Sequence, residues 1–200
     1  MIKLLIILLF IHAGSSMAQG RKGVELYHYT GCEGVLPSLS GRVYYQSGSK
    51  WYGEGRFNYE EEETYAFSMG RTFIKEGDWV YSVTPAAGIA VGKLQGISLG
   101  MNGFLSHGPV SMSTSVQYGF NLRRRVNNLF TWSEVNWQLS KHVYTGCTIQ
   151  GLSAVGAVPR WEPGLQIGFC FKDWSMPLYV FHPASGERYF ALGICREWKK

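Results

Sequence analysis

After its first twenty residues, the sequence has no apolar run long enough to form a transmembrane helix. Such a helix needs about 18 or more consecutive apolar residues, and no such stretch follows Gly20. Charged residues make up only 16% of the chain, and there is no histidine or cysteine spacing typical of a metal site and no glycine-rich phosphate loop. These absences exclude a helical membrane protein and give no indication of a cofactor, so we expect none.

Cysteine is also scarce. The four cysteines, Cys32, Cys147, Cys170 and Cys195, are enough for two disulfides in an oxidising compartment. Three of them lie inside segments that we expect to be strands, where any small apolar side chain would serve equally well. We therefore expect free thiols that are buried or face lipid.

Aromatic residues are abundant, at 15% of the chain, and there are 25 glycines. Many aromatics together with few charges indicate a large surface that is not solvated by water. The net charge of +5 comes from scattered basic residues in a chain that we expect to be exported, so we do not expect nucleic acid as a partner.

The first eighteen residues have the features of a secretory signal peptide. Lys3 precedes the apolar run 4–11, and the small residues Ser16 and Ala18 precede the expected cleavage site. We predict cleavage after Ala18, so that the mature chain begins at Gln19. The alternative is an uncleaved hydrophobic anchor.

Residues 51–73 show the pattern that dominates the rest of the chain. Large apolar residues alternate with small or polar ones over 51–59 and again over 65–73, and the acidic run 60–63 separates the two segments. This period of two, broken by a short polar stretch, predicts a β-hairpin. We expect residues 60–63 to form a solvated hairpin tip, and the alternative is a site for a divalent cation.

The same alternation continues to the end of the chain. We predict an all-β fold, a single up-and-down antiparallel transmembrane β-barrel over residues 51–198 with about ten strands, eight or twelve being the alternatives. Residues 19–50 contain no segment that reaches the about 9–11 residues of a membrane-crossing strand. We therefore expect an irregular periplasmic N-terminal segment there, and the alternative is an additional pair of strands.

The expected turns differ in length at the two ends of the barrel. Turns near residues 74–78, 107–109, 140–142 and 173–174 are short, whereas the loops near 121–128, 151–159 and 182–187 are longer. Short periplasmic turns opposite longer external loops are typical of outer-membrane barrels, as are aromatic girdles. Six aromatic residues are predicted to share the short-turn end: Trp51, Phe73, Trp79, Trp137, Trp174 and Trp198.

Three segments carry a resemblance to a known group of proteins. Residues 51–60, 67–73 and 130–134 resemble small uncharacterised bacterial outer-membrane β-barrel proteins of the porin-like kind. The last strand, ending in Trp198, is similar to the aromatic-ended signal by which the barrel assembly machinery recognises its substrates. The resemblance covers residues 51–198 and implies the outer membrane of a Gram-negative bacterium as the location. It brings no catalytic residues, and we expect a protein that is not an enzyme.

Four charged residues have the parity that points into the barrel: Glu54, Arg56, Glu134 and Lys172. Charges inside a barrel pair with one another or with water, whereas a basic residue at the middle of the lipid face would cost about 2–4 kcal/mol. We expect a lumen charge network that largely occludes the barrel, and hence a structural or interaction role. The alternative is a narrow channel for small polar solutes.

Two loops offer further hypotheses. Arg123, Arg124 and Arg125 suggest contacts with lipopolysaccharide phosphates through charge-assisted hydrogen bonds, and a generic polar loop is the favoured alternative. His182, Ser185 and Glu187 share one loop and suggest a second alternative, a lipid-acting hydrolase, although a flexible loop rarely fixes the geometry of a nucleophile and its base. The partners we expect are outer-membrane lipid, lipopolysaccharide and the barrel assembly machinery, and we expect a monomer.

Overall fold

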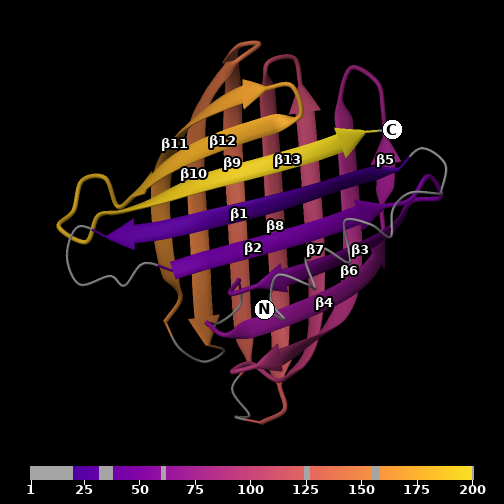
Figure 1. Cartoon of the computed structure of the whole chain (residues 1–200), viewed down its shortest axis with the longest axis vertical. Coiled ribbons are helices and arrows are strands. Elements are labelled where there is room, and N and C mark those ends of the chain that lie inside the picture. Colours follow the sequence, from indigo (N-terminus) through magenta and orange to yellow (C-terminus); the bar gives the residue numbers. More distant parts are fainter. Residues whose placement is uncertain (1–19, 32–37, 60–61, 124–126, 155–157, 200) are drawn as a thin grey trace.

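The computed structural model of the chain describes residues 20–31, 38–59, 62–123, 127–154 and 158–199. Thirteen antiparallel strands form one sheet within these residues, and β1 pairs with β13, which closes the sheet into an up-and-down barrel (Figure 1). This confirms the all-β barrel that the alternation predicts. The strands are β1 (Arg21–Gly31), β2 (Ser38–Gln46), β3 (Trp51–Phe57), β4 (Thr64–Arg71), β5 (Phe73–Lys75), β6 (Val80–Gly92), β7 (Gly96–His107), β8 (Val110–Asn121), β9 (Asn128–Ser140), β10 (Val143–Ala154), β11 (Arg160–Phe171), β12 (Trp174–Phe181) and β13 (Tyr189–Lys199).

Strands β4 and β5 are two halves of one crossing of the wall. Both pair with β6, and the register is the same on both sides of the break, where Gly70 faces Ala86 and Phe73 faces Val83. By this register, Pro85 of β6 lies opposite Arg71, the last residue of β4. Because proline has no N–H to donate, the ladder is interrupted at this point. Counting β4 and β5 together, the thirteen strands make twelve crossings.

Twelve crossings rather than about ten means that the expectation of an irregular segment at residues 19–50 is wrong. Its alternative, an additional pair of strands, is what the structure has: β1 and β2. The pair is hard to recognise because β1 carries Arg21, Glu25 and Tyr27 on its inward face and Lys22 and His28 on the other. Polar residues on both faces conceal the period of two on which strand prediction depends.

The side chains alternate between the lumen and the outer surface as predicted. Ser98 and Gln117 point inward and are 1% and 4% exposed, whereas Ile97 and Leu99 on the outside are 49% and 50% exposed. An outer surface of large apolar side chains is what a barrel wall in contact with lipid requires. In the described part of the chain, no helix is long and apolar enough to cross a membrane.

The two ends of the barrel differ. The connections after β2, β5, β7, β9 and β11 are short, and they lie at the end where β1 begins and β13 finishes. All connections at the opposite end are longer than these except the one between β6 and β7. The six aromatic residues of the predicted girdle are all found in or next to strand ends on the short-turn side, and among them Trp51, Trp79 and Trp137 are more than half exposed.

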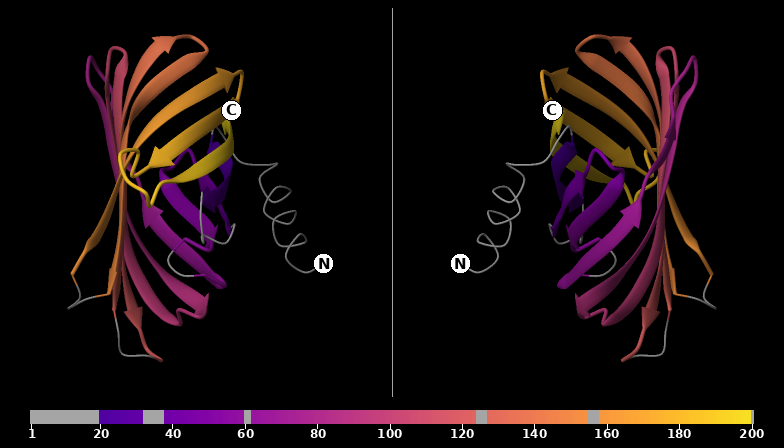
Figure 2. Two further views of the ribbon diagram at one scale, coloured as in Figure 1. Left: turned by 90° about the vertical axis from the view of Figure 1, so that its left-hand side faces the viewer. Right: turned by 90° about the vertical axis from the view of Figure 1, so that its right-hand side faces the viewer.

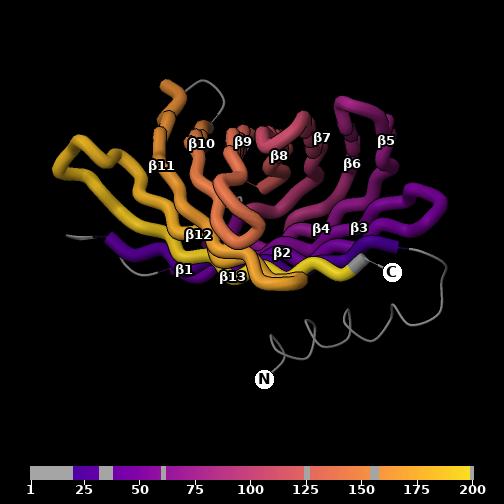
Figure 3. Tube along the Cα trace, turned by 90° about the horizontal axis from the view of Figure 1, so that it is seen from above, coloured from indigo at the N-terminus to yellow at the C-terminus, as the bar shows by residue number. Residues whose placement is uncertain are grey.

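Two walls face each other across the lumen. Strands β1, β2, β12 and β13 cross obliquely in front of β6 to β9 in Figure 1, and the view from above in Figure 3 shows the space between these walls. The side views in Figure 2 show the same opposition. Contacts between side chains of the two walls therefore decide how open the lumen is.

The described cysteines, Cys147, Cys170 and Cys195, are free, which confirms that expectation for these three. Cys32 and the expected signal peptide, residues 1–18, lie outside the described residues.

Candidate functional site

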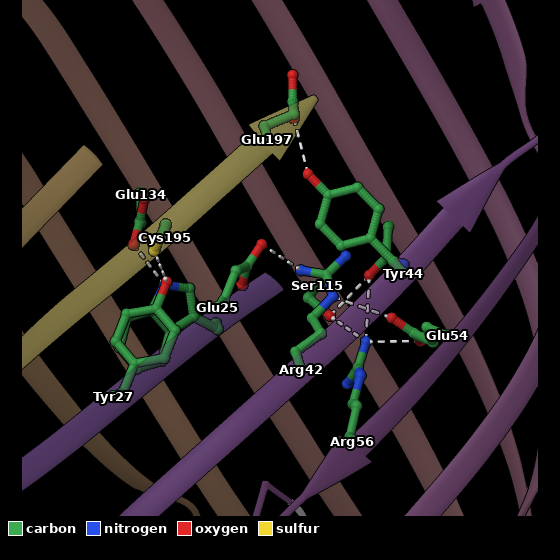
Figure 4. Close-up of polar contacts among 12 residues, drawn as sticks. Glu25, Tyr27, Arg42, Tyr44, Glu54, Arg56, Ser115, Glu134, Cys195 and Glu197 are labelled. Carbon is green, nitrogen blue, oxygen red and sulfur yellow. Dashed lines mark hydrogen bonds and ion pairs between the residues drawn. The ribbon is translucent and has the colours of Figure 1, made fainter. Parts of the chain in front are cut away.

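Four charged side chains from three neighbouring strands form an alternating row inside the barrel, which we call the charge row: Glu25, Arg42, Glu54 and Arg56 (Figure 4). Arg42 lies 3.5 Å from a carboxylate oxygen of Glu25 and 3.1 Å from one of Glu54. Arg56 lies 2.9 Å from the other oxygen of Glu54, and both of these side chains are only 4% exposed. The predicted pairing of Glu54 with Arg56 is therefore present.

The Glu54 carboxylate is also hydrogen-bonded by neutral donors. The hydroxyl of Tyr52 donates to Oε2 at 2.7 Å and that of Ser68 donates to Oε1 at 2.9 Å. Tyr52 in turn accepts a hydrogen bond from Nη2 of Arg42 at 2.8 Å. A buried carboxylate is tolerated only when charges and donors compensate its lost hydration, and Glu54 has both.

Arg56 carries the charge row across the lumen. It extends from β3, and its guanidinium donates to Oε1 of Gln117 at 2.6 Å and to Oγ of Ser115 at 3.2 Å, both on β8. Ser115 in turn donates to Oδ1 of Asn102 on β7 at 2.8 Å. One side chain thus joins β3 to β8 across the lumen.

Glu134 lies in the lumen as predicted, but in a separate cluster. Its carboxylate accepts hydrogen bonds from Nε1 of Trp132 at 2.7 Å and from the hydroxyl of Tyr179 at 2.8 Å. A weaker contact comes from Asn136 at 3.4 Å. Within the described residues, no cation lies within ion-pair distance of this carboxylate, so neutral donors alone stabilise it.

Aromatic rings fill the part of the lumen around Glu134. Tyr27 of β1 contacts Trp132 of β9 and Tyr179 of β12, with ring centroids 6.0 and 6.2 Å apart. Tyr59 packs edge-on against Tyr27 at 6.5 Å and against Phe130 at 6.1 Å. These rings form a second bridge between the walls, beside that of Arg56.

Two cavities lie along the lumen. An inner cavity of about 430 Å³ is lined by Glu25, Arg42 and Arg56 of the charge row and extends to Arg21 and Ser175 near the short-turn end. An outer cavity of about 650 Å³ opens among the longer loops. Three rings line both cavities, and we call them the aromatic layer: Tyr29, Tyr59 and Phe130.

Tyr59 is positioned by the connection between β3 and β4. The side-chain amide of Asn58 donates to the carbonyl of Leu39 at 2.8 Å and accepts from the backbone N–H of Glu63 at 2.6 Å. Asn58 has φ of 57°, a left-handed conformation that asparagine tolerates better than most residues. Burial, reinforced by the negative charge of Glu25, raises the pKa of the Tyr59 phenol well above its usual value, so the ring stays uncharged.

Positive and negative charges are balanced along the pathway. The charged residues that line the two cavities are five arginines, Arg21, Arg42, Arg56, Arg160 and Arg188, and five glutamates, Glu25, Glu62, Glu134, Glu162 and Glu187. Most of the arginines are paired. Arg21 binds Glu197, and Arg160 lies 3.1 Å from Glu162 and 3.8 Å from Glu187.

Lys172 is not part of the lumen network, so this expectation is wrong. Strand β11 ends at Phe171, and Lys172 lies in the following turn with φ of 54°, exposed, with its ammonium 5.5 Å from the centre of the Phe171 ring. The alternation that placed Lys172 inward holds only inside a strand, and the left-handed turn residue no longer follows it.

Sequence reasoning missed Glu25 and Arg42 because their strands were not recognised. Alternate residues of 21–29 do carry a signal, since Arg21, Glu25, Tyr27 and Tyr29 share one parity and all line the inner cavity.

The structure describes only part of the two loops at residues 60–63 and 123–125. The backbone N–H of Arg123 donates to Asn121, whereas Arg124 and Arg125 lie outside the described residues, so lipopolysaccharide contacts stay a prediction. Glu62 and Glu63 contact Lys93 at 3.2 and 3.7 Å, and their neighbours at 60 and 61 are also outside the described part.

The proposed hydrolase residues do not form a catalytic pair in this conformation. The hydroxyl of Ser185 donates to the backbone carbonyl of His182 at 3.3 Å rather than to its imidazole. A nucleophilic serine needs a base within hydrogen-bond reach of its hydroxyl.

Comparison with solved structures shows which known barrels have this fold. The KdgM porin matches with a TM-score of 0.58 and 10% identity, over 87% of this chain and 98% of that one. The NanC porin matches with a TM-score of 0.56 and 9% identity, over 90% and 99%. A second KdgM structure, described as a complex with disordered oligogalacturonate, matches equally well. These likenesses show that the chain has the barrel fold of these porins.

No family model matches the sequence, and no curated protein matches it.

Proposed function

We propose that the chain is an outer-membrane β-barrel forming a narrow channel for small polar solutes, and that the channel is closed in this conformation. One observation carries the proposal. Two polar cavities lie one behind the other along the lumen and meet at the same three rings, Tyr29, Tyr59 and Phe130. A barrel with a purely structural role needs no cavity, whereas a transport pathway needs an entrance, an exit and a constriction between them.

Three features support the outer membrane of a Gram-negative bacterium as the location. The outward rows are apolar, the girdle of tryptophans marks a membrane interface, and the fold resembles that of porins. Export through a signal peptide cleaved after Ala18 belongs to the same proposal, as does recognition by the barrel assembly machinery. We propose a monomer without enzymatic activity.

The charge balance along the pathway favours uncharged or zwitterionic solutes. One KdgM structure is described in complex with oligogalacturonate, an acidic oligosaccharide. An acidic polymer in this lumen would meet five glutamates. The arginines that line the lumen are largely paired with carboxylates of the protein already. Because like charges brought together in a low-dielectric pore repel strongly, we propose that polyanions are excluded.

Planar-bilayer recording tests the channel. The purified wild-type barrel is expected to conduct poorly, because Arg56 and the aromatic layer bridge the lumen. Tyr59→Ala removes one ring of this layer and is expected to produce stable openings that permit swelling of liposomes in small neutral sugars. Tyr81→Ala is the matched control, because Tyr81 is an outward tyrosine that is 43% exposed.

The same recordings separate the second candidate, a structural or interaction barrel. That role is favoured by the bridge from Arg56 to Gln117, which is buried and hydrogen-bonded at 2.6 Å. If wild type and Tyr59→Ala are equally silent while both are folded, the structural role is favoured over the channel. Large stable openings in the wild type would instead show that the constriction is misplaced.

A further inference from the structure

A second group of cations lies on the outer surface, at the short-turn end of the barrel. The guanidinium of Arg196 is 4.9 Å from the ring centre of Trp174 and 4.5 Å from that of Trp198. The ammonium of Lys22 is 5.7 Å from the ring centre of Trp198. With Lys172 over Phe171 at 5.5 Å, they form what we call the outer cation patch: Lys22, Lys172, Arg196 and the rings of Phe171, Trp174 and Trp198.

The strand register places this patch on the outside of the barrel. Arg196 of β13 pairs with Trp174 of β12, which pairs with Phe171 of β11, and Lys22 of β1 pairs with Trp198. Residues directly opposite each other in a sheet point to the same face. Trp174 and Phe171 are 42% and 61% exposed, as expected for residues on the outer surface.

The three cations have no carboxylate partner among the described residues. Asp173 lies in the same turn as Lys172 but forms no ion pair with any of the three, and Glu197 points inward to Arg21 and Tyr44. The Nε of Arg196 is buried and has no hydrogen-bond acceptor. This differs from the lumen, where Arg42 and Arg56 are both paired with Glu54.

We propose that the outer cation patch binds the phosphodiester headgroup of an anionic phospholipid. Arginine and lysine form strong charge-assisted hydrogen bonds to phosphate, and contacts with two indole rings hold the guanidinium in place. The apolar outward residues of the same strands, among them Leu178, Leu192 and Ile194, are 43% to 48% exposed and provide a surface for the acyl chains.

The position of the outer cation patch along the barrel favours a phospholipid over lipopolysaccharide. The patch lies at the end with the short turns, where β1 begins and β13 finishes, and this end of an outer-membrane barrel faces the periplasm and the phospholipid leaflet. Lipopolysaccharide belongs to the opposite leaflet, at the level of the long loops. This inference rests on the proposed outer-membrane location but not on channel activity.

Native mass spectrometry of the full chain, folded in a neutral detergent, tests the site. The barrel is titrated with phosphatidylglycerol and with phosphatidylcholine of the same acyl chains, and bound lipids are counted. Wild type is expected to prefer phosphatidylglycerol. Arg196→Gln should weaken this binding about fivefold, which is about 1 kcal/mol per cation, and Lys22→Gln with Arg196→Gln should remove the preference.

Lys75→Gln is the matched control. Lys75 is an exposed cation of β5 near the short-turn end, and it makes no ring contact in the part of the chain that the structure describes. Each variant is first checked for an unchanged shift in mobility on boiling, so that loss of the fold, which would count against the proposed barrel itself, is distinguished from loss of the lipid site.

Equal binding of the two lipids by folded wild type would overturn the proposal. So would an equal loss in Lys75→Gln, or a preference for lipopolysaccharide over phosphatidylglycerol. Displacement of the lipid by inorganic phosphate in large excess would identify a site for a free anion instead.

Discussion

Replacing Glu54 by glutamine removes one negative charge from the charge row and leaves its shape nearly unchanged. In the wild type, this carboxylate is 3.1 Å from Arg42 and 2.9 Å from Arg56, with its side chain 4% exposed. Arg42 keeps Glu25 at 3.5 Å, and Arg56 keeps its hydrogen bonds to Gln117 and Ser115 on β8. Removing one partner of a buried ion pair costs about 3–5 kcal/mol. Because Arg42 keeps one carboxylate, we expect Glu54→Gln to lower the free energy of unfolding by about 3 kcal/mol, the lower end of that range.

Glu134→Gln is the control that separates charge pairing from hydrogen bonding. The Glu134 carboxylate is held by Trp132, Tyr179 and Asn136, which are all neutral. Its replacement leaves no buried cation unpaired, so the expected cost is about 1–2 kcal/mol, that of weakened hydrogen bonds to a charged group. Urea unfolding of both variants in liposomes, followed by tryptophan fluorescence, gives the two free energies.

A double-mutant cycle sharpens the test. If Glu54 and Arg56 stabilise each other, Arg56→Gln in the Glu54→Gln background should cost less than Arg56→Gln alone, with a coupling energy of about 1–3 kcal/mol. Equal destabilisation by Glu54→Gln and Glu134→Gln, together with additive effects in the cycle, would refute the ion-pair argument. We also expect Glu54→Ala to raise the conductance of the barrel, because Arg56 loses the anchor on its own wall.

Three further predictions follow from the wall and the loops. Val116→Arg, on the outer face, should destabilise the barrel in bilayers by about 2–4 kcal/mol. Ser113→Arg, at a residue that lines the inner cavity, should destabilise it by clearly less. Similar urea midpoints for the two variants would contradict the predicted inward and outward faces of β8. Asn58→Ala removes the hydrogen bonds that position the Tyr59 connection, and should raise the frequency of channel openings in bilayers relative to Leu122→Ala, an exposed loop substitution at the same end. The mature chain should fractionate with the outer membrane and shift in gel mobility on boiling; recovery as a soluble periplasmic protein would rule out the location.

The sequence by itself determined the type of structure. Alternation of large apolar with small or polar residues is a local property of each strand, because successive side chains point to opposite faces. It therefore predicted that Ile97 and Leu99 face outward and that Ser98 faces the lumen, and all three do. The placement of Trp51 and Trp79 at the short-turn end was predicted in the same way, because turn lengths and girdle residues can both be identified in the sequence.

The number of strands was predicted less well. Alternation is recognisable when one face is apolar, and β1 and β2 present polar or charged residues on the lumen side and some on the outside as well. β1 pairs with β13, which is remote from it in the sequence, and β2 pairs with β3. Neither pairing could be predicted before β1 and β2 were recognised as strands. The prediction that Lys172 points into the lumen was wrong for a related reason, because the exact end of a strand decides which way the residues near it point.

Only the tertiary structure decided which side chains meet inside the barrel. Arg56 and Gln117 are 61 residues apart in the sequence, and Tyr27 and Tyr179 come from β1 and β12. Parity shows that each of these residues points inward, but it says nothing of the height at which they lie or which wall they face. Those positions depend on how many strands close the barrel and on the stagger between them, which is a property of the whole sheet. The division of the lumen into two cavities at Tyr29, Tyr59 and Phe130 therefore arises only when all twelve crossings are in place.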